Sequence, residues 1–198
     1  ASCVDKTYWS LIGQQTGALV YGYGIGGTTI ARRQKPLDVP NPNKYFGSRA
    51  GAMIPDADVI VIFGGTNDFG GSDPAMGTMD DRTDSTFYGA YHNLINLLYC
   101  CYPNAKIVIM TPLHRLTEDD DTYNEQASRR GGKLSDYVEA IREVAGYYGL
   151  PVADMFRDCP IQPRCPGQQE KYMPDGVHPN DAGHELVAQT LLRTLKKL

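Results

Sequence analysis

The chain has 198 residues, of which 41% are hydrophobic and 21% charged, and its formal net charge at pH 7 is −4. This length and composition suit one globular domain with a sizeable core, and we expect residues 1–198 to form a single domain. The mildly acidic balance and the absence of a long basic run argue against a nucleic-acid partner. No apolar run approaches the roughly 20 residues that a membrane-spanning helix needs.

The predicted elements alternate between helices and strands. In chain order we expect a helix at 6–16, a strand at 17–23, an irregular connection at 32–57, a strand at 58–63, a helix at 85–101 capped by Ser85, a strand at 106–110, a helix at 127–148, a short strand at 151–154 and a helix at 180–197 capped by Asn180. This alternation predicts a parallel sheet with helices on both faces. Ligands bind such folds beyond the carboxyl ends of the strands.

A polar turn with the sequence Gly65-Thr66-Asn67-Asp68 follows the strand expected at 58–63. Glycine lets the backbone turn sharply with a positive φ. Asn67 then offers an uncharged NH₂ donor at the rim of the sheet, which suits the oxyanion that develops during acyl transfer. Asp68 is expected to cap the following turn or to fix Asn67. Because Gly and Asn also favour ordinary turns, the motif alone leaves both interpretations open.

Residues 22–27 satisfy the G-x-G-x-x-G spacing of dinucleotide-binding loops. Such a site also needs a helix and a second strand that ends in an acidic residue about 20 positions later. Residues 34–48 are rich in proline and show no strand pattern, which argues against a nucleotide. The alternative is a glycine whose N–H group points into the site, and Gly27 best fits that role as a second oxyanion donor beside Asn67.

Asp175 precedes His178 by three residues in the proline-bounded segment 173–179. A general base must hold one tautomer and keep its other ring nitrogen free. In a tight turn, Asp175 can bind the Nδ1–H group of His178 and leave Nε2 exposed; a merely polar surface turn is the alternative. A metal would have Asp175, His178 and His184 available, but no cysteine or second carboxylate lies at ligand spacing, so no metal is expected. His114 and Arg115, at the end of another strand, are expected to contact substrate.

Together these motifs resemble the SGNH hydrolase family, also called GDSL. Gly27 matches its second block, Gly65 to Asp68 match the G-x-N-D of its third, and Asp175 to His178 match the D-x-x-H of its last. The resemblance covers nearly the whole chain and implies a flavodoxin-like three-layer α/β/α sandwich with a parallel five-stranded sheet. It also implies that His178 is the general base, that Asp175 orients it, and that Asn67 and the Gly27 N–H stabilise the oxyanion.

The Gly-Asp-Ser block that carries the nucleophile in this family does not occur in the sequence. The family's strand order, 2-1-3-4-5, puts the missing strand between the strands expected at 17–23 and 58–63. We therefore expect a first strand upstream of Ala1, because the sheet would otherwise have a gap lined by unpaired N–H and C=O groups. Ser2 is an alternative nucleophile, but it lacks the preceding Gly-Asp and has no room for a strand before it.

The leading hypothesis is a carboxylic ester hydrolase with a Ser-His-Asp triad and no cofactor. Polar loops rich in Tyr and Asp favour small-molecule or carbohydrate esters with small acyl groups such as acetyl. The alternatives are a non-catalytic ligand-binding protein and a nucleotide-binding flavodoxin-like domain. The sequence leaves open the acyl chain, the alcohol, the oligomeric state and the compartment (periplasmic or secreted, or cytoplasmic). It also leaves open whether Cys159 and Cys165 form a disulfide, although free thiols are favoured.

Overall fold

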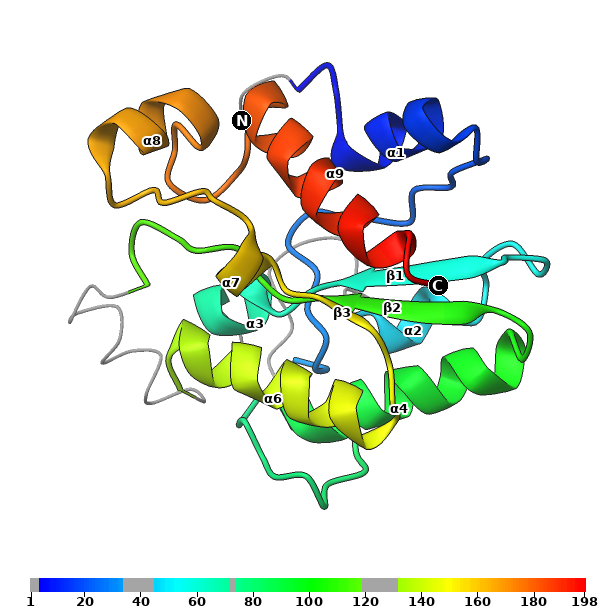
Figure 1. Ribbon diagram of the computed structural model, residues 1–198. Coiled ribbons are helices and arrows are strands. Elements are labelled where there is room, and N and C mark those ends of the chain that lie inside the picture. Colours follow the sequence, from blue (N-terminus) through cyan, green and yellow to red (C-terminus); the bar gives the residue numbers. More distant parts are fainter. Residues whose placement is uncertain (1–3, 34–44, 72–73, 119–131) are drawn as a thin grey trace.

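A parallel sheet lies at the centre of the computed structural model, which describes residues 4–33, 45–71, 74–118 and 132–198 (Figure 1). Its strands are β1 (Val59–Phe63), β2 (Lys106–Met110) and β3 (Val152–Ala153), hydrogen-bonded in the order β1-β2-β3. Ile60 of β1 lies opposite Ile107 of β2, and Ile109 opposite Val152 of β3. The strands expected at 58–63, 106–110 and 151–154 are therefore confirmed.

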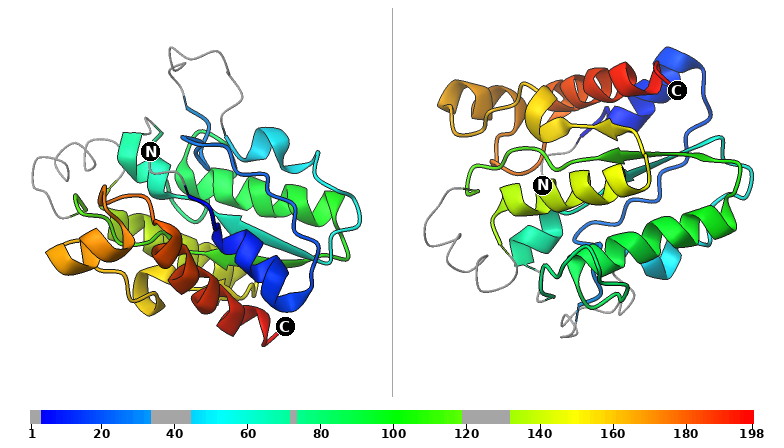
Figure 2. Two further views of the ribbon diagram at one scale, coloured as in Figure 1. Left: turned by 90° about the horizontal axis from the view of Figure 1, so that it is seen from above. Right: turned by 60° about the horizontal axis from the view of Figure 1, so that its bottom comes forward.

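Four long helices form the outer layers of the fold: α1 (Tyr8–Thr16), α4 (Phe87–Cys101), α6 (Leu134–Tyr147) and α9 (Asp181–Leu195). Side chains alternate along β2, so that Ile107 and Ile109 pack into one core with α4 and α6, and Val108 and Met110 into a second core with α1 and α9. Helices thus cover both faces of the sheet, as Figure 2 shows. The predicted three-layer α/β/α sandwich is confirmed.

Capping side chains determine where two of these helices begin. The side chain of Asn180 accepts a hydrogen bond from the Gly183 N–H and caps α9, as predicted. In α4, however, Thr86 and not Ser85 is the cap, because its hydroxyl accepts the bond from the Gly89 N–H. The described ranges also contain four short helices that were not predicted: α2 (Gly47–Ala50), α3 (Thr66–Gly71), α7 (Met155–Asp158) and α8 (Pro166–Tyr172).

The strand predicted at 17–23 is wrong. These residues form no strand, and Leu19 keeps 86% of its surface exposed. Within the described residues, β1 pairs on one side only, with β2, and the backbone of 18–24 makes no backbone hydrogen bond. A strand needs a neighbour to satisfy its N–H and C=O groups, and the described part of the chain places no strand beside 17–23. The described part of the sheet therefore has three strands where five were expected.

Some predicted elements extend beyond the described residues. Residues 34–44 of the connection expected at 32–57 lie outside them, as do residues 127–131 of the helix expected at 127–148 and Ser2, the alternative nucleophile. Within the described ranges, no helix has the length and apolar character needed to cross a membrane.

Candidate active site

A tight turn between α8 and α9 holds the predicted general base. Gly176 donates its N–H to the carbonyl of Met173 at 2.7 Å and has a φ of +73°, a conformation that favours glycine. The turn brings Asp175 back onto His178. One carboxylate oxygen lies 2.8 Å from the Nδ1 atom of His178, and the other accepts the backbone N–H of His178 at 2.7 Å. The predicted contact between Asp175 and His178 is therefore present.

The electrostatics of this turn favour an ionised Asp175. Partial burial by itself would raise the pKa of Asp175, but hydrogen bonds from the backbone and ring of His178 and from the Val177 N–H lower it to about 2. The His178 side chain remains 74% exposed. Its Nδ1 atom faces Asp175, and its Nε2 atom has no hydrogen-bond partner among the described residues. A neutral imidazole in this arrangement is oriented to accept a proton at Nε2.

Asn67 lies at the start of α3, directly beyond the carboxyl end of β1. The chain reaches it through Gly65, whose φ of +106° makes the sharp turn that the sequence predicted. The Nδ2 atom of Asn67 donates a hydrogen bond of 2.8 Å to the carbonyl of Thr28. An amide nitrogen carries two hydrogens, so one donor remains available after this bond is made.

Gly27 lies next to Thr28, in a turn closed by the bond from the Thr28 N–H to the Ile25 carbonyl. Its φ is +73°, and a Cβ atom added to it would meet nothing within 4 Å. The Gly27 N–H makes no hydrogen bond with the described residues. The bond from Asn67 thus reaches the residue after Gly27, and these two predicted oxyanion donors are 40 positions apart in the sequence.

The buried side chain of Asp68 connects α3 to the segment that follows Gly27, a role that the sequence did not predict. Its carboxylate is 1% exposed and accepts the backbone N–H groups of Ile30 and Ala31, both at 2.9 Å. Burial raises the pKa of Asp68 to about 6, although these bonds oppose the shift. Asp68 therefore holds α3 against the segment after Gly27. From the sequence, Asp68 was expected to cap the following turn or to fix Asn67, but these bonds go to Ile30 and Ala31.

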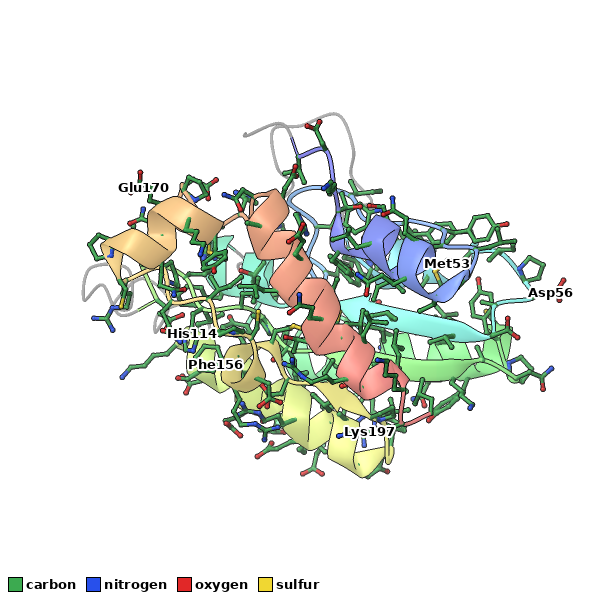
Figure 3. All side chains as sticks on the ribbon, turned by 45° about the horizontal axis from the view of Figure 1, so that its top comes forward. Met53, Asp56, His114, Phe156, Glu170 and Lys197 are labelled. Carbon is green, nitrogen blue, oxygen red and sulfur yellow. The ribbon has the colours of Figure 1, made fainter. Side chains whose placement is uncertain are left out.

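Arg115 and His114 lie in the loop after β2, but Arg115 does not have the exposure expected of a substrate contact. Arg115 is 9% exposed, and its Nη1 atom donates to the carbonyl of Thr66 at 2.9 Å. The His114 ring packs against Phe156, with ring centroids 3.9 Å apart, and its Nδ1 atom lies 2.6 Å from Glu118 (Figure 3). No local sequence pattern predicted these tertiary contacts.

Other chemistries find less support among the described residues. The glycine-rich loop at 22–27 is followed by residues 28–33, which form no helix, so the dinucleotide arrangement is not built there. No group of three or more His, Cys, Asp or Glu side chains in the described ranges could hold a metal ion. Cys159 and Cys165 are free thiols.

No serine hydroxyl in the described part of the chain is hydrogen-bonded to His178. Ser10, which lies in α1, donates its hydroxyl to the carbonyl of Thr7 at 2.8 Å. The described residues therefore contain His178 with Asp175 bound at its Nδ1 atom, and Asn67 and Gly27, which are the predicted oxyanion donors.

Comparison with known proteins gives an independent view of the chain. The model of the GDSL-like Lipase/Acylhydrolase family matches residues 5–186. A GDSL lipase of Mycobacterium tuberculosis is 29% identical over 177 residues, which cover 86% of this chain and 64% of that protein. The chain thus spans slightly less than two thirds of the length of this curated relative.

Solved structures share the fold. A crystal structure of a Lactobacillus plantarum protein is 28% identical, with a TM-score of 0.83, and the match covers 99% of this chain and 90% of that one. An acetyl xylan esterase structure is similar at the level of fold, with a TM-score of 0.65, 21% identity and coverage of 94% of this chain and 89% of that one.

Proposed function

The chain belongs to the GDSL-like lipase/acylhydrolase family, and on that basis we propose that the protein hydrolyses carboxylic esters through a covalent acyl-enzyme. The observation that carries the proposal is the His178 imidazole, which Asp175 holds at Nδ1 while Nε2 stays open to solvent. Gly27 and Asn67 offer their N–H groups at the same edge of the sheet. This set of groups is what acyl transfer requires in addition to a nucleophile.

In the proposed reaction a serine hydroxyl attacks the ester carbonyl as its proton passes to Nε2 of His178. The new C–O bond gives a tetrahedral intermediate whose oxyanion accepts hydrogen bonds from the Gly27 N–H and Asn67 Nδ2. The intermediate collapses, the alcohol leaves and takes the proton from His178. Water then attacks the acyl-serine with His178 again as base, which releases the carboxylic acid and restores the serine.

The nucleophile in this proposal is a serine outside the described residues. The free edge of β1 supports a place for it, because a parallel strand paired there would end at the same edge of the sheet as Asn67.

We propose small, polar esters as substrates, with short acyl groups such as acetyl on carbohydrate. This substrate class is supported by the solvent exposure of His178 and by the polar residues around it. The helix α8, which leads into the turn, buries none of its residues, and Gln169 donates from its side chain to the Pro174 carbonyl at 3.2 Å. An exposed base beside a polar helix suits a hydrated substrate better than a long acyl chain, which needs an apolar channel.

A non-catalytic ligand-binding protein is the second candidate, because no serine of the described residues reaches His178. One experiment separates the two functions. The intact mass of the protein is measured before and after exposure to a fluorophosphonate probe, and hydrolysis of p-nitrophenyl acetate is followed in parallel. One adduct on a serine, lost in His178→Ala and in heat-unfolded protein, is expected for the hydrolase. No adduct and no hydrolysis would exclude the hydrolase and favour binding alone.

A further inference from the structure

The loop after β2, residues 113–118, connects the two halves of the candidate site. At Arg115 it contacts α3, which carries Asn67, and at Leu116 it contacts the turn that carries Asp175 and His178. These halves come from segments more than 100 positions apart in the sequence. The loop therefore connects the helix that carries Asn67 directly to the turn that carries His178.

On the α3 side, the link is the guanidinium of Arg115. Its Nη1 atom lies 2.9 Å from the carbonyl oxygen of Thr66 and 3.4 Å from the Thr66 hydroxyl. Its Cζ atom lies 5.3 Å from the centre of the Phe69 ring, also in α3. A planar group held by a hydrogen bond and by ring contact has little freedom to move. Since Thr66 directly precedes Asn67, Arg115 holds the backbone from which the Asn67 amide projects.

On the other side, the link is a backbone contact to the base turn. The Leu116 N–H donates to the Gly176 carbonyl at 2.9 Å. The approach is so close that a Cβ atom on Gly176 would lie 2.5 Å from the Cβ atom of Leu116. Gly176 lies between Asp175 and His178, so the loop is in direct contact with the turn that orients the imidazole.

The buried carboxylate of Glu118 holds the loop next to its contacts with α3 and the base turn. Glu118 is 8% exposed, and its two oxygens bind different groups of the loop. One accepts the Arg115 backbone N–H at 2.7 Å, and the other lies 2.6 Å from Nδ1 of His114. The His114 ring also packs against the Phe156 ring (Figure 3). These two bonds of Glu118 restrain the loop at His114 and Arg115, next to both of its contacts with the site.

We infer that Arg115 is a positioning residue that sets the distance between the Asn67 oxyanion donor and the His178 base. The inference rests on the proposed function and adds a residue to it. Arg115 is too buried to bind a substrate carboxylate, and its Nη1 atom is directed at Thr66. Displacements near 1 Å in such a site reduce turnover by up to about a hundredfold, so the effect should fall on kcat.

The test compares Arg115→Met and Arg115→Lys with the control Arg193→Met. Arg193 makes a similar bond, from Nη2 to the Asp158 carbonyl at 3.1 Å, but it lies in the last turn of α9. With p-nitrophenyl acetate we expect Arg115→Met to lower kcat about 10- to 100-fold with KM changed less than about threefold. Arg115→Lys should recover part of the loss, because an ammonium can still donate to Thr66, and Arg193→Met should retain full activity.

Hydrogen exchange gives a readout that does not depend on turnover. In Arg115→Met, amide exchange should become faster both in α3 and in segment 173–178, and remain unchanged in α4. Unchanged kcat and exchange in Arg115→Met, an equal loss in Arg193→Met, or a rise in KM alone would overturn the inference. If the unmodified protein shows no hydrolysis and no probe adduct, the proposed function fails, and the exchange pattern alone still decides whether Arg115 links the two segments. Should Arg115→Met not fold, the same comparison is made with Arg115→Lys.

Discussion

The side-chain amide of Asn67 donates a 2.8 Å hydrogen bond to the backbone carbonyl of Thr28, the residue after Gly27. This bond ties the start of α3 to the segment that carries Gly27, although the two residues lie 40 positions apart in the sequence. The bond uses one amide hydrogen and leaves the second available for substrate. We therefore expect this contact to orient the Asn67 amide for its proposed role as an oxyanion donor.

Replacement of Asn67 by Ala should lower kcat on p-nitrophenyl acetate by about two to three orders of magnitude, because one oxyanion donor is lost. KM should change little, since the donor acts mainly on the transition state. Asn96→Ala is the matched control: Asn96 accepts a bond from Tyr148 at the far end of α4 and should have no effect. Equal activity of Asn67→Ala and the unmodified protein would remove Asn67 from the oxyanion hole.

Asp175→Asn should lower kcat by about ten-thousand-fold, because an amide can no longer hold His178 in the tautomer that leaves Nε2 free to accept a proton. Asp158→Asn, which removes an exposed carboxylate in α7, is the control. The pKa of Asp175 is lowered to about 2 by its hydrogen bonds. Asp175 is therefore ionised throughout the range above pH 4, so its protonation should not limit activity in that range. A kcat for Asp175→Asn within tenfold of the unmodified enzyme would contradict the orienting role.

The buried carboxylate of Asp68 should make stability depend on pH between about 4 and 6. Burial raises its folded pKa to about 6 from an ordinary 3.8, so the folded state binds a proton more tightly than the unfolded state. Its contribution to the free energy of unfolding is therefore full below pH 3.8 and is lost as pH rises through 6. The expected difference is on the order of 2 kcal/mol.

Asp68→Asn removes this titration while keeping a side chain of the same shape. Urea unfolding at pH 4 and at pH 6.5 measures the effect. We expect the free energy of unfolding of the unmodified protein to fall, relative to Asp68→Asn, as pH rises between these values. Other titrating groups occur in both proteins and cancel in the comparison. Parallel curves for the two proteins would show that Asp68 does not titrate in this window.

Gly176→Ala tests the close approach of the loop to the base turn. The substitution places a methyl group 2.5 Å from the Leu116 Cβ atom at a residue with φ of +73°. We expect destabilisation of about 1–3 kcal/mol in urea unfolding, together with lower kcat. Gly167→Ala in α8 is the control, because its Cβ atom would meet nothing within 4 Å and its φ is not positive. A neutral Gly176→Ala would mean that the turn tolerates displacement.

Local patterns in the sequence were enough for several features of this protein. The continuous apolar runs predicted β1 and β2, and the cap at Asn180 predicted the start of α9, because hydrophobic burial and capping act over a few residues. The contact between Asp175 and His178 was predictable for the same reason, since three residues in one turn cannot separate far. The family followed from motif order along the chain.

Tertiary structure decided the rest. Residues 17–23 have the composition of a strand, yet they form none, because a strand depends on a partner for its backbone groups and no neighbouring strand is present within the described residues. The bonds from Asn67 to Thr28, from Ile30 to Asp68, and from Arg115 to Thr66 join segments between 38 and 49 positions apart. Such contacts depend on how the sheet brings its loops to one edge, and no local pattern carries that information.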